Sequence, residues 1–209
     1  MKIGIIGAGK IGSTAARLFV NAGNEVALSN SRGGQGLESV IAGLKGKATA
    51  TSVEEAAKFG EVVLLAIPFG KYKTLPKYGF HDKVVIDANN YYPSRDGNFP
   101  ELDTKETTSS ELVSEHLKGA RLVKAFNTIW FEHLATEGDT KARLEDRRAI
   151  FMSGDDTQAK EIVAQLIEDI GFAAVDMGFL HEGGRQQEPG SNVYNNDVSV
   201  KEAADLLAV

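Results

Sequence analysis

The stretch that decides the fold is Lys2 to Gly12, KIGIIGAGKIG. Its first half, Lys2 to Ile6, is a short apolar run rich in β-branched residues, which predicts a buried strand. Its second half, Gly7 to Gly12, matches the spacing G-x-G-x-x-G. A helical pattern of apolar residues follows over 13–22 and ends at Gly23. A strand, a glycine-rich turn and a helix in this order predict the start of a dinucleotide-binding βαβ unit.

Each glycine of this turn has an expected task at a bound dinucleotide. Gly7 permits the tight turn, Gly9 lets the backbone approach the pyrophosphate, and Gly12 lets the helix pack on the strand. The free N–H groups at the start of the helix offer partial positive charge to the phosphates. The alternative is a purely structural glycine turn, but the strand before it and the helix after it favour the cofactor site.

The end of the next predicted strand, Glu25 to Ser29, indicates which dinucleotide is bound. Sites for NAD usually carry Asp or Glu near this point, to hold the ribose 2′-hydroxyl. Here the chain continues Asn30-Ser31-Arg32, without an acid. A guanidinium, a hydroxyl and an amide would bind a 2′-phosphate through charge-assisted hydrogen bonds. We therefore expect NADP(H), held by Asn30, Ser31 and Arg32; the alternative is that Arg32 is a solvated loop residue.

The rest of the chain alternates between predicted strands and helices. The continuous apolar run at 61–67 is typical of a strand buried on both faces of a parallel sheet, and 83–87 is predicted to be the next strand. Capping boxes predict helix starts at Ser52 and Thr108. The alternation predicts an α/β fold, a doubly wound and mostly parallel Rossmann-like sheet with right-handed crossovers. Further strands are expected at 48–51, 120–125, 149–153 and 173–176, and further helices at 35–44 and 155–170, the last capped by Asp155.

We expect residues 1–209 to form one Rossmann-like domain, because no linker or repeat divides them. Residues 89–107 hold two prolines and many polar residues, which predicts a long loop that is either functional or mobile. The extension 180–209 is expected to belong to the same domain, as a loop over 180–196 and a short helical segment over 200–208. This loop is expected to fold over the pocket, with Arg185 as an anion contact.

Ligands in such sheets lie outside the carboxyl ends of the strands, so the other strand ends also matter. Ile67 and Pro68, followed by Phe69, would form a rigid wall for a nicotinamide. Asn89 and Asn127 could orient its carboxamide, although turn or cap chemistry is the commoner role of Asn. We assign no catalytic side chain, because hydride transfer between two bound rings can rest on positioning alone.

Composition disfavours several classes of function. The chain has no Cys, which excludes disulfides, a thiolate nucleophile and Cys-based metal sites, and its four His lack the spacing of metal ligands, so no metal is expected. Its net charge of −6 argues against nucleic-acid binding. The longest apolar stretch, 62–69, is about half of a membrane span. At the N-terminus the apolar run is too short for a signal peptide, and Lys10 interrupts it. We therefore expect a cytoplasmic protein that acts on a small molecule.

Several motifs, in their order along the chain, resemble the NADP oxidoreductase family that includes coenzyme F420-dependent NADP reductase. They are MKIGIIGAGKIG at 1–12, SNSRG at 29–33, AIPF at 66–69, DANN at 87–90, KAFNT at 124–128, SGDD at 153–156 and AVDMG at 174–178. The resemblance implies an NADP-binding Rossmann domain, a shallow pocket where a deazaflavin or flavin-like ring stacks on the nicotinamide, and often a homodimer. It places Ala8, Gly9, Lys10 and Ile11 at the pyrophosphate, Ser31 and Arg32 at the 2′-phosphate, Ile67, Pro68 and Phe69 beside the nicotinamide, and Asn127 near its carboxamide.

The main expectation for function is an NADPH-dependent oxidoreductase that moves hydride between the nicotinamide and a planar acceptor such as F420 or a flavin. The stretch 181–196, HEGGRQQEPGSNVYNN, replaces the apolar helical segment with which the F420 reductases continue, so the identity of the acceptor stays open. The alternative from another class is an NADPH-binding module or sensor without turnover of its own. A conventional alcohol or imine dehydrogenase would need a substrate domain or a proton relay that the sequence does not indicate.

Overall fold

The computed structural model describes residues 1–44 and 46–207, and its strands form one continuous sheet. The strands are β1 (Lys2–Ile6), β2 (Glu25–Ser29), β3 (Ala48–Thr51), β4 (Val62–Leu65), β5 (Val84–Asp87), β6 (Arg121–Ala125), β7 (Ala149–Gly154) and β8 (Ala173–Asp176). Their order is β3-β2-β1-β4-β5-β6-β7-β8, and each neighbouring pair is parallel except β6 and β7. The predicted doubly wound α/β fold is therefore confirmed, with its strand order reversing between β1 and β4.

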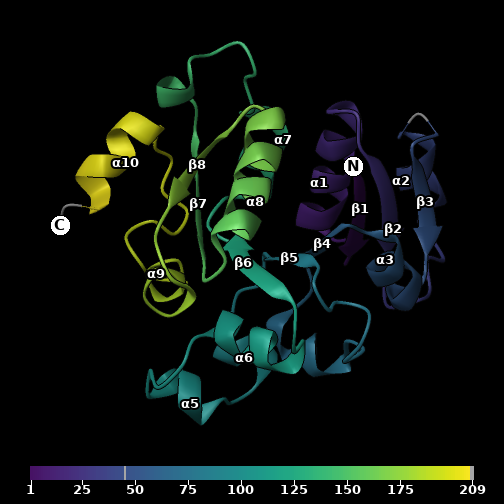
Figure 1. The fold of residues 1–209 in the computed structure, drawn as a ribbon, viewed down its shortest axis with the longest axis horizontal. Helices are drawn as coiled ribbons and strands as arrows, with labels where there is room; N and C mark the ends of the chain where they lie inside the picture. The colour runs from purple at the N-terminus through teal and green to yellow at the C-terminus, as the bar shows by residue number, and fades with distance from the viewer. Residues whose placement is uncertain (45, 208–209) are drawn as a thin grey trace.

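Helices cover both faces of this sheet, so the molecule has three layers (Figure 1). One core lies under α1 (Lys10–Asn21), α7 (Phe131–Thr136) and α8 (Thr157–Asp169). The other lies under α3 (Val53–Phe59), the 3-10 helix η1 (Phe69–Thr74), α6 (Ser109–His116) and α9 (Leu180–Gln186). The shorter elements are α2 (Glu38–Ala42), α4 (Pro93–Asp96), α5 (Pro100–Asp103) and η2 (Leu144–Asp146), and the last helix is α10 (Val200–Leu207).

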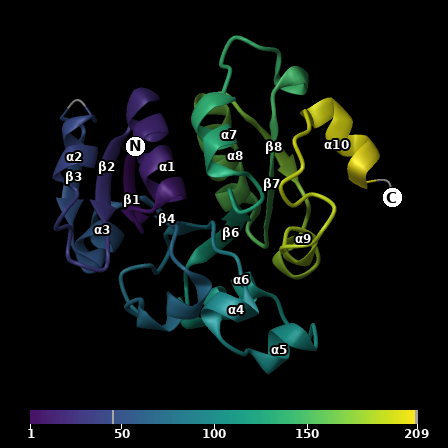
Figure 2. The ribbon, with the colours of Figure 1, turned by 180° about the vertical axis from the view of Figure 1, so that it is seen from behind.

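The two cores follow from the alternation of side chains along the buried strands. In β1, Ile3 and Ile5 face the core under α1, whereas Ile6 faces the core under α3. Because both faces are covered, these strands are apolar without interruption, which is the pattern that predicted them. In Figures 1 and 2 the C-terminal helix α10 lies at the opposite end of the molecule from β3.

Local signals predicted several helix ends correctly. Both capping boxes are present: Ser52 and Glu55 bond reciprocally at the start of α3, and Thr108 and Glu111 do so at the start of α6. The predicted cap of α8 was wrong by one residue, because Asp156 accepts the hydrogen bond from the backbone N–H of Ala159.

Four predicted segments differ from the structure. The first helix begins at Lys10 instead of residue 13, directly on the glycine turn. The predicted helix 35–44 shortens to α2, because the glycine-rich residues before it form turns. The predicted loop 180–196 was wrong over its first seven residues, which form α9, and the loop 89–107 contains α4 and α5. The helix predicted at 200–208 is present as α10, while residue 208 lies outside the described residues.

Among the described residues, no helix has both the length and the apolar character needed to cross a lipid bilayer.

Candidate functional site

A cavity of about 330 Å³ lies where β1, β4, β5 and β6 end. It is lined by the start of α1, by the segments after β4, β5 and β6, and by two residues of the C-terminal tail. This is the carboxyl edge of the sheet, beside the reversal of strand order, where open α/β sheets bind their ligands. The predicted residues in its lining are Gly9, Lys10, Ile11, Ile67, Pro68, Asn89 and Asn127; the others are Ala66, Ala88, Asn90, Tyr92, Arg95, Phe126, Ile129, Trp130, Phe131, Tyr194 and Asn195.

A larger cavity, of about 800 Å³, lies elsewhere, between η1, α5 and α6. Its charged lining mixes lysines with Glu101 and Glu115, and it shares no residue with the cavity at the strand ends. We therefore take the cavity at the strand ends as the candidate site.

The glycine turn has the geometry that its spacing predicts. A Cβ on Gly12 would lie 1.8 Å from the carbonyl oxygen of Gly7, and a Cβ on Gly7 would lie 2.2 Å from that of Ala66. In contrast, among the described residues no atom outside the chain neighbours of Gly9 lies within 4 Å of its Cβ position. Packing thus requires Gly7 and Gly12, while the space beside Gly9 is open, which fits a pyrophosphate that approaches the backbone.

The start of α1 points its backbone at the same space. Gly9 is the N-cap and gives no side-chain cap, so the first N–H groups of the helix are available to a ligand. The Nζ atom of Lys10 lies 4.0 Å from the ring centroid of Phe131, a cation–π contact across the cavity lining. Ala8 lies behind the turn, where its carbonyl oxygen accepts a hydrogen bond from the Ser13 hydroxyl at 3.0 Å.

The loop after β2 lies beside the glycine turn, since the N–H of Gly7 donates to the carbonyl oxygen of Ser29 at 3.0 Å. Asn30 shapes this loop from within. Its Oδ1 accepts from the N–H groups of Arg32 (2.9 Å) and Gly34 (3.1 Å), and its Nδ2 donates to the carbonyl oxygen of Gln35 (2.9 Å). Ser31 and Arg32 are exposed. The polar side chains left for a 2′-phosphate are therefore those of Ser31 and Arg32, with Asn30 as their support.

Asn89 joins two strand ends and keeps one unused donor. Its Oδ1 accepts a hydrogen bond from the N–H of Ile67 at 2.9 Å, which fixes the amide orientation. Its Nδ2 is buried and has no hydrogen-bond partner among the described residues. Because an unpaired buried donor costs about 1–3 kcal/mol, native structures rarely leave one. An acceptor atom of a ligand in the cavity would satisfy this donor.

A buried charge pair fixes the backbone that carries Asn89. Asp87 accepts hydrogen bonds from the Ser110 hydroxyl (2.6 Å) and from the N–H of Asn89 (3.1 Å), and the Nζ of Lys124 donates to the Ser110 hydroxyl at 2.8 Å. Burial raises the pKa of Asp87 and lowers the pKa of Lys124, while their mutual attraction opposes both shifts. This network ties α6 to the strand ends below the cavity.

Phe69 and Asn127, which were predicted to bind the cofactor, make contacts within the protein. Phe69 does not line the cavity: it is fully buried and stacks on Tyr72, with ring centroids 4.9 Å apart. It was predicted as part of the nicotinamide wall, but η1 begins at this residue and places its side chain in the core. Asn127 does line the cavity, yet its Nδ2 donates to Asn90 Oδ1 (3.0 Å) and to the carbonyl oxygen of Gln187 (2.7 Å).

Several lining residues have no role predicted from the sequence. Tyr92 lies in the segment 89–107 and Tyr194 in the segment 180–196, which were both predicted as loops. Their hydroxyls hydrogen-bond to each other. Burial raises the pKa of the Tyr194 hydroxyl above its ordinary range, and the hydrogen bond with Tyr92 adds to this shift. Trp130, which follows the KAFNT motif closely, is 45% exposed. The tail thus reaches the cavity as expected, but through Tyr194 and Asn195, and Arg185 does not line it.

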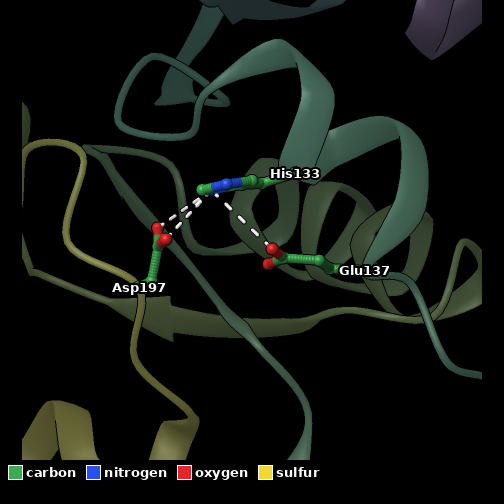
Figure 3. A group of neighbouring side chains, drawn as sticks. All are labelled: His133, Glu137 and Asp197. Carbon is green, nitrogen blue, oxygen red and sulfur yellow. Dashed lines mark hydrogen bonds and ion pairs between the residues drawn. The ribbon is translucent and has the colours of Figure 1, made fainter.

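A cluster of charged side chains ties this tail to α7 (Figure 3). His133, Glu137 and Asp197 lie close enough to share a metal ion. However, the buried guanidinium of Arg148 already hydrogen-bonds both carboxylates, and His133 Nδ1 lies 3.0 Å from Asp197 Oδ2. Hydrogen bonds from Arg148 and His133 outweigh burial and lower the pKa of Asp197. The cluster is therefore an ion-pair site with Arg148 between the two carboxylates.

Comparison with known proteins places the chain among oxidoreductases. Residues 2–91 match the family described as NADP oxidoreductase, coenzyme F420-dependent. The hypothetical protein SMa0349 of Sinorhizobium meliloti is 33% identical, with a TM-score of 0.81 and 95% of each chain covered. A candidate F420-dependent NADP reductase from Arthrobacter sp. FB24 has the same fold (21% identity, TM-score 0.71, 100% of this chain and 90% of that chain).

Among curated proteins, the metalloreductase STEAP3 of Rattus norvegicus is 26% identical over 183 residues. The match covers 86% of this chain, and the chain spans about a third (34%) of that relative's length.

Proposed function

Because the chain belongs to the NADP oxidoreductase family described as coenzyme F420-dependent, we propose that it transfers hydride between NADP(H) and a planar acceptor such as F420 or a flavin. The observation that carries the proposal is the open space beside Gly9, at the edge of a cavity where the strand order reverses. The cofactor class follows from the family, and the planar acceptor is our inference.

In this proposal, different residues of the chain bind different parts of the cofactor. The N–H groups at the start of α1 and the side chain of Lys10 hold the pyrophosphate. Ser31 and Arg32 bind the 2′-phosphate, and the free Nδ2 of Asn89 donates to an oxygen of the nicotinamide half. Ile67 and Pro68 form the wall beside the ring. When bound, NADPH supplies a hydride from its nicotinamide.

The test is a paired titration followed by a screen of acceptors. The chain has one tryptophan, Trp130, which lines the cavity, so energy transfer from it to reduced nicotinamide reports binding. NADPH and NADH are titrated separately, and the NADPH complex is then mixed without oxygen with F420, FMN, FAD, a quinone or ferric iron. We expect NADPH to bind at least about tenfold more tightly than NADH, because a phosphate–guanidinium contact is worth about 1.5–3 kcal/mol.

The outcomes separate the candidate functions. Fast oxidation of NADPH by a ring acceptor supports the proposal and names the acceptor. Tight NADPH binding without oxidation by any of them supports the alternative, an NADPH-binding module or sensor. If neither nucleotide binds, both functions are wrong.

The homodimer and the cytoplasmic location remain proposals as well. The homodimer rests on the resemblance, and the location on the lack of Cys. Sedimentation velocity of the purified chain tests the first, since a monomer would contradict it.

A further inference from the structure

Two segments form one side of the cavity, and the proposed function assigns them no contact with the cofactor. Tyr92 stands just before α4, and Tyr194 stands in the tail between α9 and α10. They are 102 residues apart in sequence, but their hydroxyls form a hydrogen bond and both residues line the cavity. Asn195, next to Tyr194, is anchored by its backbone N–H, which donates to the carbonyl oxygen of Thr128 at 2.9 Å. The structure therefore brings a phenol pair to the same cavity as Ile67 and Pro68.

The surroundings keep Tyr194 protonated, and a positive charge lies beside Tyr92. Tyr194 is half-buried in a setting that disfavours the phenolate, so its hydroxyl holds its proton at neutral pH and has it to donate. The guanidinium carbon of Arg95 lies 4.8 Å from the ring centroid of Tyr92. Arg95 is held by Asp96, at 2.7 Å, and by the carbonyl oxygen of Asn90. Its charge would stabilise a phenolate that forms for a moment, since opposite charges attract strongly in a partly buried site.

Other polar groups in the lining suit proton transfer less well. Asparagine and tryptophan side chains do not act as acids in proteins, and Arg95 is already hydrogen-bonded to Asp96 and to the carbonyl oxygen of Asn90. Lys10 lies against the Phe131 ring and belongs to the pyrophosphate side of the cavity. The acid that remains is the tyrosine pair.

Resting on the proposed function, we propose that Tyr194, supported by Tyr92, donates the proton that the acceptor takes up together with the hydride. The acceptor is then a conjugated ring with a nitrogen or oxygen that becomes protonated on reduction, as in flavins, deazaflavins and quinones. One electron pair reaches the acceptor with the hydride, and the O–H bond of Tyr194 breaks as the new N–H or O–H bond forms. Tyr194 regains a proton from Tyr92, and Tyr92 regains one from water. The net change converts NADPH, one solvent proton and the acceptor into NADP⁺ and the reduced acceptor.

The test compares Tyr194→Phe and Tyr92→Phe with Tyr78→Phe as the matched control. Tyr78 is 79% exposed and does not line the cavity. Each variant keeps the aromatic ring, and its melting temperature shows whether it is folded. Binding of NADPH is measured by Trp130 fluorescence, and hydride transfer to FMN, F420 and menadione is measured in single turnovers in H₂O and D₂O.

We expect the dissociation constant of NADPH to stay within about twofold of wild type in all three variants, because neither lining tyrosine faces the phosphates in this proposal. Tyr194→Phe should transfer hydride about 100-fold more slowly, the low end of general-acid effects. Its rate should rise as the pH falls, because free acid replaces the phenol, and its D₂O effect should differ from wild type. Tyr92→Phe should show a smaller loss, and Tyr78→Phe none.

The outcomes distinguish this proposal from the proposed function. An active wild type with an equally active Tyr194→Phe overturns the proton donor alone. A slow Tyr194→Phe with an unchanged pH profile and D₂O effect shows that Tyr194 only shapes the pocket, which also overturns it. A wild type that binds NADPH but reduces none of the three acceptors overturns the proposed function and this proposal together.

Discussion

In the glycine turn, one added methyl group should weaken cofactor binding at Gly9 but should destabilise the fold at Gly12. In Gly9→Ala the new Cβ meets no atom within 4 Å in the described part of the chain, apart from its chain neighbours, and the backbone of Gly9 is extended, at φ −75° and ψ −166°. Alanine gains about 0.4–1 kcal/mol by restricting the unfolded chain. As an N-cap it is poorer than glycine by a similar amount, so the two effects roughly cancel. We expect the free energy of unfolding to change by less than about 0.5 kcal/mol.

The same methyl group fills the space that we assign to the pyrophosphate. If it displaces one hydrogen bond to the charged phosphates, worth about 1.5–3 kcal/mol, NADPH binds about 10- to 150-fold more weakly. In Gly12→Ala the Cβ would lie 1.8 Å from the carbonyl oxygen of Gly7, so α1 must move. Such overpacking costs about 3 kcal/mol, which lowers the melting temperature of a chain of this size by about 6–12 °C.

Thermal unfolding and Trp130 fluorescence titration of both variants are the assays. Gly9→Ala should lose NADPH binding and keep its melting temperature, whereas Gly12→Ala should melt early. A Gly9→Ala variant that binds NADPH as wild type does would show that the pyrophosphate does not lie over Gly9. A Gly9→Ala variant that melts early would show that the space is needed by the fold itself.

Three further predictions concern charged side chains. Arg32→Ala should weaken NADPH about 10- to 100-fold and leave NADH unchanged, because only NADPH carries the 2′-phosphate; equal losses in parallel titrations would exclude Arg32 as the selective residue. Arg148→Met leaves the Glu137 and Asp197 carboxylates facing each other without their shared cation. Because both carboxylates are partly exposed, the free energy of unfolding in denaturant should fall by about 2 kcal/mol, between the values for surface and buried pairs. No measurable loss would contradict the ion-pair role. Arg121 hydrogen-bonds Asp156 at 2.7 and 2.8 Å and holds its pKa well below the ordinary value, so this pair stabilises the fold above about pH 4 and is lost as the pH falls. The melting temperatures of wild type and Asp156→Asn should therefore converge below about pH 4, and a constant difference down to pH 3 would contradict this assignment.

Much of the fold is local enough to be predicted from the sequence. The apolar runs of β4 and β5 are buried on both faces, and two capping boxes set the starts of α3 and α6. The tail helix α9 was missed because Gly183 and Gly184 weaken its helical pattern. The structure shows why residue 183 is a glycine, because a Cβ at this position would lie 2.5 Å from the carbonyl oxygen of Met177. Tertiary packing therefore selected glycine against local helix propensity.

The site was predictable only where it depends on one short stretch. Gly9, Lys10 and Ile11 follow from a spacing, and Asn89 follows from its place after a strand. Tyr92 and Tyr194 meet through a contact between segments about a hundred residues apart, which no local pattern encodes. The wrong cap at Asp155 has a similar cause. Two adjacent aspartates suit the helix start equally well in sequence, but Asp155 accepts a hydrogen bond from the N–H of Leu180 instead.

The measurement that decides whether this pocket transfers hydride is a single turnover with NADPH deuterated at C4 of the nicotinamide. The complex is mixed without oxygen with F420, FMN or menadione, and nicotinamide oxidation is followed in time beside unlabelled NADPH. We expect a primary isotope effect on that step, and with F420 the deuterium should appear on carbon in the reduced deazaflavin. If NADPH binds but no acceptor oxidises it, or if oxidation proceeds without an isotope effect and without transfer of the label, the chain does not transfer hydride between these rings.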